Sequence, residues 1–340
     1  MKRIIIENFG LLLKAEIIIN DVNVFIGPAS SGKSTMAKLI SVFQNPLFKP
    51  NASMDELNEL FSAYNIDSKI GNKTYIRYDD GELFVEIKEK TIRSNFMSKG
   101  VGSTNLIYIP SERSFFPIIT QSIFGLMSSN ISLPKWLIDF GAKFEQARNS
   151  LKKMDVDFLN ARYEYDGSND YIYLSNNGRI KLSQASSGLQ SVIPLLLVIQ
   201  HNTSKRNKKR DLFVIEEPEL NLYPTSQKDL IEYIVGRLNQ SGDKLILTTH
   251  SPYLLTAIDN LIQAQNVISQ YHDEYDKVTK LVPEEYWIKY DNVSCYYFDV
   301  GASRSTMDDE TKSIGPSNID NVSEKLSATF EQLLALKYAK

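Results

Sequence analysis

The chain has 340 residues, of which 42% are hydrophobic and 23% are charged, and these values are close to those of average globular proteins. This composition excludes a disordered or fibrous chain. The 38 Lys and Arg side chains nearly balance the 41 Asp and Glu side chains, so the net charge of −3 gives no overall positive field for nucleic acid. The single cysteine, Cys295, excludes an intramolecular disulfide and a metal site built from cysteines.

The sequence contains no segment with the character of a membrane span. Its longest apolar run, residues 192–199, is interrupted by Pro194 and is far shorter than the roughly 20 residues that a span requires. The amino terminus lacks the hydrophobic core of a signal peptide. One cysteine also suits a reducing compartment. We therefore expect a soluble cytoplasmic protein without a membrane partner.

The first third of the chain predicts several strands and one helix. Three short runs rich in isoleucine and valine, at 4–6, 15–19 and 22–26, are separated by turn residues and predict strands. The third run leads through a glycine-bounded loop into a segment with the apolar spacing of a helix. Residues 75–88 predict a hairpin, and residues 106–109 predict a short strand.

The rest of the chain predicts a helical lobe followed by an α/β core. Helical spacing of apolar residues recurs within 114–165, up to Met154, which predicts a helical lobe inserted between two halves of a strand-rich core. A helix, the strand 212–215, a crossover helix and the strand 245–249 follow, which is the pattern of a parallel sheet. A hairpin around 296–298 and a terminal helix complete the chain.

Residues 27–34, GPASSGKS, match the pattern G-x-x-x-x-G-K-[ST] of a phosphate-binding loop without a mismatch. The glycines allow the backbone to wrap a phosphate, and the start of the following helix supplies N–H donors and a positive dipole. We expect Lys33 to reach the β- and γ-phosphates of a nucleotide and to act in catalysis, and the Ser34 hydroxyl to be a Mg²⁺ ligand. The alternative is a glycine-rich turn that happens to precede a lysine. The predicted nucleotide-binding residues of this loop are Gly27, Pro28, Ala29, Ser30, Ser31, Gly32, Lys33, Ser34 and Thr35.

Two adjacent carboxylates, Glu216 and Glu217, end the predicted strand at 212–215. Their burial at the edge of a sheet is costly unless a cation neutralises them, and Mg²⁺ with a polyphosphate does so. Alternation along a strand sends the two side chains to different places. We therefore predict Glu216 as a Mg²⁺ ligand and Glu217 as the general base or water-orienting residue. An acidic loop without chemistry is the alternative, and Glu219 is expected to be structural.

One of the three histidines, His250, directly follows the predicted strand 245–249. A histidine at this edge, adjacent to the carboxylates, can donate to the γ-phosphate and sense its presence. We predict a catalytic role for His250. His201 and His272 have no such context and are expected on the surface.

Four motifs stand in the order that ABC-type ATPases share. They are GPASSGKST at 27–35, ASSGLQS at 185–191, LFVIEEPELNLYP at 212–224 and TTHSPYLL at 248–255. The chain resembles the ABC-ATPase heads of the SMC-like and OLD-like group, the AAA-family ATPases of the AAA15 or AAA21 type. This resemblance implies an α/β fold of the P-loop NTPase class: an ABC-type head with a mixed, mostly parallel core sheet, an antiparallel β subdomain and a helical lobe.

The resemblance also implies a site completed by a second copy. In that family Ser186, Ser187 and Gly188 would form the signature motif, which contacts the γ-phosphate of ATP held by the partner. Two hydroxyls and a glycine at a helix N-terminus suit an anion, and an ordinary helix cap is the alternative. The implied assembly is a homodimer that sandwiches two ATP molecules with Mg²⁺.

Several positions depart from the family pattern. Glu216 stands at the metal position in place of the usual aspartate, as in the EEPE form of OLD-like heads, and Tyr223 occupies the position of the D-loop aspartate. Ser111 stands at the position of the Gln loop. For Arg113, close by, two interpretations stay open: contact with the γ-phosphate and relay of its presence to the helical lobe, or a surface ion pair.

The chain is interpreted as a single head with four parts. The parts are an N-terminal core lobe with the phosphate loop and the β subdomain (1–113), a helical lobe insertion (114–180), a core with the signature, the carboxylates and His250 (181–262) and a C-terminal cap (263–340). Long coiled-coil arms and a Toprim nuclease domain are not expected. The acidic cluster Asp308-Asp309-Glu310 is interpreted as a solvated loop.

We expect an ATPase, an ATP-hydrolysing switch that controls a separate effector protein. By resemblance this effector would be a nuclease or a toxin in bacterial anti-phage defence. The alternatives are the nucleotide-binding subunit of an ABC transporter, a repair-type ATPase that acts on nucleic acid, and a sensor that binds ATP without hydrolysing it. The one basic run, at 205–210, is either a contact with nucleic-acid phosphates or a solvated loop.

Overall fold

The computed structural model describes residues 2–44, 53–66, 70–81, 84–95, 105–119, 133–174, 178–205, 209–315 and 320–338, with the backbone alone for 320–326. Within these ranges the main feature is a mixed 11-stranded sheet. Its strands are β1 (Lys2–Phe9), β2 (Leu12–Ile19), β3 (Val22–Ile26), β4 (Tyr75–Asp79), β5 (Phe84–Lys88), β6 (Thr91–Ser94), β7 (Asn105–Ile109), β12 (Asp211–Glu216), β13 (Lys244–Thr249), β14 (Val293–Asp299) and β15 (Ala302–Ser305).

The strand order of this sheet is β6-β5-β4-β1-β2-β15-β14-β3-β13-β12-β7. The half that runs from β14 to β7 is parallel, with Val24 opposite both Leu247 of β13 and Cys295 of β14. The half that runs from β6 to β2 is antiparallel. All six residues of β12 are buried, as expected for a parallel strand that is covered on both faces. The predicted α/β class, the parallel core and the antiparallel β subdomain are confirmed.

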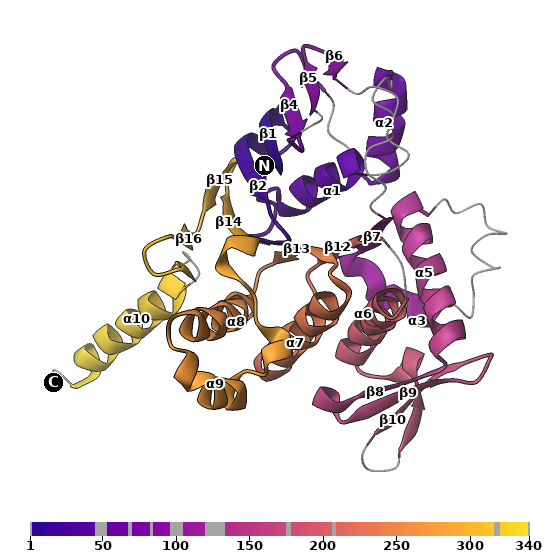
Figure 1. The fold of residues 1–340 in the computed structure, drawn as a ribbon, viewed down its shortest axis with the longest axis vertical. Coiled ribbons are helices and arrows are strands. Elements are labelled where there is room, and N and C mark those ends of the chain that lie inside the picture. The colour runs from indigo at the N-terminus through magenta and orange to yellow at the C-terminus, as the bar shows by residue number, and fades with distance from the viewer. Residues whose placement is uncertain are drawn as a thin grey trace.

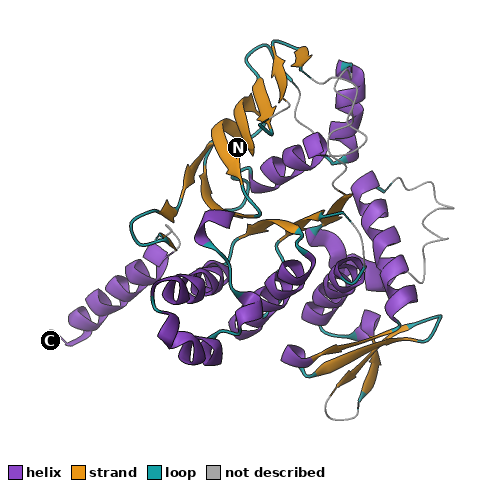
Figure 2. Cartoon of the chain, in the orientation of Figure 1, coloured by secondary structure: helices purple, strands orange, loops and turns teal. Residues whose placement is uncertain are grey.

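Helices cover both faces of the parallel half (Figure 1). One face carries α1 (Lys33–Gln44), with α2 (Met54–Ala63) next to it. The other face carries α6 (Ser187–Thr203), α7 (Pro224–Ser241) and α8 (Pro252–Gln270). Figure 2 shows that α7 connects two neighbouring strands, β12 and β13. The helices predicted after the phosphate loop and between these strands are therefore confirmed.

The lobe that follows β7 contains helices and a second sheet. The helices are α3 (Phe116–Ile119) and α5 (Lys135–Leu151). The sheet is antiparallel, in the order β11-β10-β9-β8, and its strands are β8 (Lys153–Val156), β9 (Ala161–Tyr165), β10 (Asp170–Leu174) and β11 (Arg179–Lys181). The sequence did not predict this sheet, and the helical position of Met154 was wrong because Met154 lies in β8. The helix ends earlier because Lys152 adopts a positive φ of 56°.

The C-terminal part adds α9 (Tyr275–Leu281), the short pair β16 (Met307–Asp308) and β17 (Ser313–Ile314), and α10 (Asp320–Tyr338). The acidic cluster at 308–310 forms an exposed turn, in which the backbone N–H groups of Glu310 and Thr311 donate to Asp308. The terminal helix was predicted and is confirmed. It projects away from the rest of the molecule (Figure 1).

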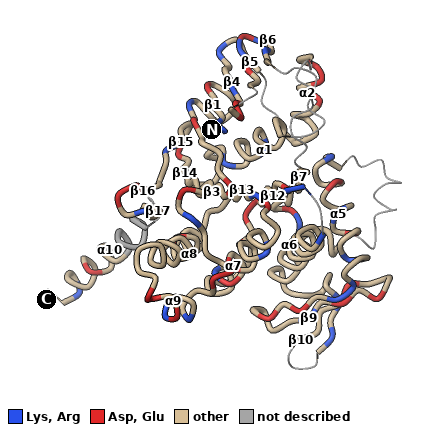
Figure 3. Tube along the Cα trace, in the orientation of Figure 1, with Lys and Arg blue, Asp and Glu red and all other residues tan. Residues whose placement is uncertain are grey.

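Charged residues of both signs are interspersed along the trace (Figure 3), in keeping with the net charge of −3. Within the described ranges, every helix is too short or too polar to cross a membrane.

Candidate functional site

The phosphate-loop sequence connects β3 to α1 at the carboxyl end of the parallel strands. Two of its glycines have a positive φ, 151° at Gly27 and 100° at Gly32. A Cβ at Gly27 would lie 2.1 Å from the carbonyl oxygen of Phe298 in β14, and one at Gly32 would lie 2.5 Å from the side chain of Leu12. Close contact with two strands therefore requires glycine at both positions.

Lys33 is the first residue of α1, and its side chain folds back over the loop. Its Nζ donates to the carbonyl oxygens of Gly27 at 2.9 Å and Pro28 at 2.7 Å. Burial lowers the pKa of Lys33 to about 8, although the carboxylates of Glu217 and Glu219 raise it. It also donates to the Ser31 hydroxyl at 3.4 Å. A desolvated ammonium group held by neutral acceptors alone is a favourable partner for an incoming phosphate.

Glu216, the last residue of β12, has a buried side chain that is not fully hydrogen-bonded. The residue is 4% exposed, and its Oε1 has no hydrogen-bond partner among the described residues. Burial raises the pKa of Glu216, whereas the charge of Lys38 and the hydroxyl of Ser34 lower it. An unpartnered carboxylate oxygen beside a serine hydroxyl fits a hard divalent cation such as Mg²⁺. The residues present therefore suit the predicted metal site.

Glu217 departs from strand geometry and points elsewhere. Its φ of 43° lies in the left-handed region, which is costly for a residue with a side chain and is found mainly where function requires it. Its backbone N–H donates to the carbonyl oxygen of Thr248 at 2.9 Å. Its Oε1 lies 3.4 Å from His250 Nε2, and both side chains are partly exposed. The two carboxylates therefore diverge, one into the protein and one toward the surface.

Glu219 fixes the turn that carries His250. Its Oε1 accepts hydrogen bonds from the Thr249 hydroxyl at 2.6 Å and from the His250 backbone N–H at 2.8 Å. The contacts agree with the structural role expected for Glu219. Through them the turn after β12 holds the turn after β13.

The signature residues begin α6. Ser186 is the N-cap, and its hydroxyl accepts from the N–H of Leu189 at 3.5 Å, so Ser186 does cap the helix. Ser186 and Ser187 are nevertheless exposed. Gly188 is buried, and a Cβ there would lie 2.8 Å from the carbonyl oxygen of Asn221. Gly188 therefore brings the start of α6 against the turn that follows β12, while α6 itself covers the face of the sheet opposite α1 (Figure 1).

Arg113 is not a surface residue, and the interpretation as a surface ion pair is wrong. It is 0% exposed, in a short 3-10 helix at Ser111–Phe115. Its guanidinium donates to backbone carbonyls of Pro110, Ser191, Glu216 and Glu217. The sequence showed an arginine after a strand but not these acceptors, which come from three separate parts of the chain.

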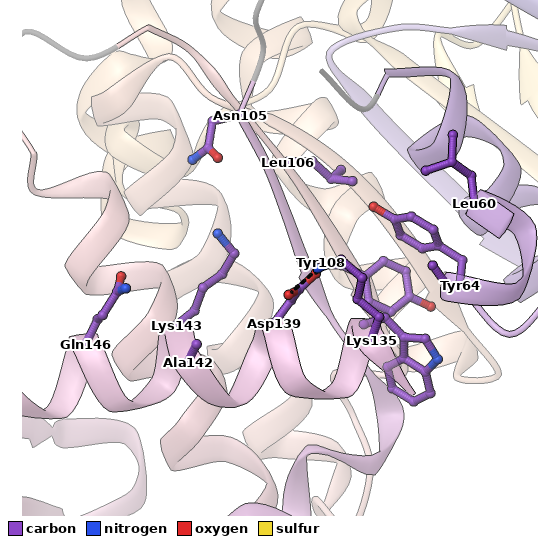
Figure 4. A pocket seen from close by; sticks show the side chains of 12 residues that line it. Leu60, Tyr64, Asn105, Leu106, Tyr108, Lys135, Asp139, Ala142, Lys143 and Gln146 are labelled. Carbon is purple, nitrogen blue, oxygen red and sulfur yellow. Dashed lines mark hydrogen bonds and ion pairs between the residues drawn. The ribbon is translucent and has the colours of Figure 1, made fainter. Parts of the chain in front are cut away.

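A hollow of about 400 Å³ lies apart from these motifs, between α2, β7 and α5 (Figure 4). Tyr108 lies between Tyr64 and Trp136, with ring centroids 6.0 and 6.1 Å apart. Lys38, one turn after Ser34 on α1, lies over the Trp136 ring. Neither Tyr108 nor Lys38 was singled out in the sequence, although the spacing from Ser34 to Lys38 places them on one face of a helix.

Comparisons with known proteins found one matching family model and several similar solved structures. The family model of an AAA ATPase domain matches residues 1–131 and 117–255. Similar solved structures include the SMC head domain from Thermotoga maritima, with 15% identity over 89% of this chain and 97% of that chain and a TM-score of 0.43. The recombination mediator protein RecF is 12% identical over 89% of this chain and 97% of that one, with a TM-score of 0.41. An ATP-binding cassette of an ABC transporter in its ADP conformation is 14% identical over 92% and 93%, with a TM-score of 0.39.

A search of the curated proteins found no match. The two matched ranges of the family model together cover 255 of the 340 residues. They include the phosphate loop, the signature, both carboxylates and His250. The chain therefore belongs to the AAA ATPase domain family, and it is an ATPase whose phosphate-loop sequence lies between β3 and α1.

Proposed function

We propose that the protein is a switch in which two copies close around two ATP molecules and reopen after hydrolysis. The observation that carries the proposal is the meeting of three motifs at one edge of the sheet. The phosphate loop, the carboxylate pair and His250 follow β3, β12 and β13, which are neighbouring strands. Carboxyl ends of parallel strands are the usual place for a ligand site in such sheets.

We assign ATP binding to residues 27–35, which include Ser34, and to Glu216. The loop amides and Lys33 contact the phosphates, and Lys33 exchanges the carbonyls of Gly27 and Pro28 for phosphate oxygens. Ser34 and Glu216 hold Mg²⁺, which neutralises charge on the phosphates when it is bound. The unpartnered Oε1 of Glu216 supports this role.

Hydrolysis is assigned to Glu217 and His250. Glu217 orients a water molecule and accepts its proton, and His250 donates to the γ-phosphate. The 3.4 Å contact between the two side chains supports a shared position beside the reacting phosphate. Lys33 stabilises the charge that develops on the phosphate oxygens.

The second copy supplies Ser186, Ser187 and Gly188. Two exposed serines at the N-terminus of a 17-residue helix suit a γ-phosphate. The start of their helix packs through Gly188 on the turn after β12, and the exposure of the two serines supports contact with a nucleotide held by another chain.

We further propose that opening and closing acts on a separate effector, a nuclease or toxin of bacterial anti-phage defence, in the cytoplasm. The resemblance to OLD-like heads supports this. The terminal helix α10 adds support, because Phe330, Leu333 and Leu336 on it are 62%, 60% and 71% exposed. Exposed apolar residues on a projecting helix are typical of a protein-binding surface. Residues 206–208 of the basic run lie outside the described residues, so contact with nucleic acid stays a prediction.

The proposal is tested by trapping the closed state. Glu217→Gln is expected to keep ATP binding, to lose hydrolysis and to form dimers that require ATP and Mg²⁺, measured by light scattering coupled to size-exclusion chromatography. Lys33→Ala in the same background is expected to remain monomeric. Hydrolysis by Glu217→Gln at the parental rate, or no dimer with ATP, contradicts the proposal.

A further inference from the structure

We propose that Arg113 is a positioning residue that joins the signature helix to the general base, so that ATP held by the partner copy sets the geometry of Glu217. The inference rests on the proposed dimer and extends it. It makes hydrolysis at one site depend on occupancy of the other.

The first step of the argument is the set of hydrogen bonds. Nη1 of Arg113 donates to the Glu216 carbonyl oxygen at 2.7 Å, and Nη2 donates to the Glu217 carbonyl oxygen at 2.7 Å. Nε donates to the carbonyl oxygen of Ser191 in α6 at 3.1 Å. A planar guanidinium holds several acceptors at fixed angles. One side chain therefore fixes the position of α6 relative to the end of β12.

The second step concerns the energetic cost of burying the charge of Arg113. Arg113 is fully buried and forms no ion pair within the described part of the chain. Burial lowers the pKa of Arg113 to about 10, although Glu219, Glu217 and Glu216 raise it, so the side chain stays charged at neutral pH. A buried charge is seldom the most stable solution for a core position. Its retention is explained by the geometry that it enforces.

The third step concerns the two backbone carbonyls that Arg113 holds. The Glu217 carbonyl belongs to a residue with a left-handed φ of 43°, and this conformation directs the Glu217 carboxylate toward His250. The Ser191 carbonyl lies about one turn beyond Ser186 and Gly188. A displacement at the start of α6 is therefore transmitted by Arg113 to the backbone that orients Glu217.

The fourth step follows from the dimer. The signature of one copy contacts the ATP of its partner, whereas Glu217 acts on the ATP of its own chain. Arg113 lies between them within one chain. The guanidinium is thus the physical link between the two sites, and we expect hydrolysis to be fast only when both are filled.

The direct test replaces Arg113 by Lys, which keeps a charge but not the fork of donors. We expect the Kd for ATP to stay within about threefold and kcat to fall by about 10- to 100-fold, as for other misplaced catalytic groups. The matched control is Arg148→Lys, which likewise keeps the charge but loses the guanidinium that lies 3.1 Å from Asp170 in the lobe. This control is expected to change stability and to leave kcat within about twofold.

Parental kcat in folded Arg113→Lys overturns the inference. A loss of ATP affinity as large as the loss of kcat also overturns it, because the damage then lies in the phosphate loop. If Arg113→Lys does not fold, Arg113→Met is measured in the same way, because an apolar side chain of similar length is better tolerated at a buried position.

A second test leaves Arg113 unchanged. Mixed dimers of Lys33→Ala with Ser186→Arg, isolated through two different tags, contain one intact composite site. In the copy that holds this ATP, the signature faces an empty site. If the two sites are coupled, the mixed dimer hydrolyses ATP at least tenfold more slowly than the parental dimer. If the sites are independent, it hydrolyses ATP at half the parental rate, and that result overturns the inference. Absence of any ATP-dependent dimer in the parental protein contradicts the proposed function instead.

Discussion

The Nε2 atom of His250 lies 3.4 Å from Oε1 of Glu217, although the two residues follow different strands. Two backbone contacts hold them there. The Glu217 N–H continues the ladder to Thr248, and Glu219 accepts from the His250 N–H. The two side chains proposed as the general base and the γ-phosphate donor are thus fixed by the same pair of turns, so that a displacement of one turn also displaces the other.

Replacing His250 by Ala is expected to lower kcat by about 10²-fold, because a positioned acid–base group contributes roughly this much. The Kd for ATP is expected to change little, since the proposal assigns the phosphate contacts to Lys33 and the loop amides. Phosphate release and nucleotide titration measure the two quantities. His272→Ala, at an exposed position, is the control. Equal activity of both variants contradicts a role for His250.

The sequence allowed the parallel core to be predicted because its signals are local. The interior of β12 is a continuous apolar run. The glycines that the phosphate loop requires are part of a recognisable sequence motif. The sheet β8–β11 was missed, since Met154 continues the helical spacing of α5 and only the left-handed Lys152 ends the helix. Arg113 could not be assigned, because three of its four acceptors are distant in sequence and all are carbonyls, which every residue possesses.

Gly27→Ala is expected to abolish detectable ATP binding and to lower the free energy of unfolding by about 1–3 kcal/mol, as for other overpacked positions. The added Cβ would meet the Phe298 carbonyl oxygen at 2.1 Å, and this carbonyl belongs to a central strand. Gly167→Ala is the matched control. Its φ of 97° carries a similar backbone cost, but nothing lies within 4 Å of the added atom. Urea unfolding and nucleotide titration distinguish the two variants, and normal ATP binding by Gly27→Ala contradicts the packing argument.

Cys295 is expected to be unreactive toward a thiol reagent in the native protein. Burial raises the pKa of the Cys295 thiol to about 12, so almost no thiolate, the reacting form, exists at pH 8. Because the thiol of Cys295 has a lower pKa in the unfolded state than in the folded state, it loses its proton more readily there. The free energy of unfolding is therefore expected to fall as the pH rises above the ordinary thiol range. Since Cys295 is the single cysteine, labelling should rise from none to one thiol per chain in guanidinium. Native labelling at the unfolded rate contradicts this expectation.

Glu216→Gln separates the predicted metal role from a purely structural one. The charge of Glu216 is buried and its Oε1 has no partner among the described residues, so the neutral amide is expected to leave the Tm of the ATP-free protein unchanged or to raise it. Hydrolysis is expected to fall by at least about 100-fold, because the substitution removes the carboxylate that we propose as a Mg²⁺ ligand. A titration of activity with MgCl₂ should shift to higher concentrations. Asp211→Asn, at the opposite end of the same buried strand, is the control and should not alter the Mg²⁺ dependence. A lower Tm with an unchanged MgCl₂ titration would assign Glu216 to the fold alone, because only the loss of a metal ligand changes the magnesium dependence of activity.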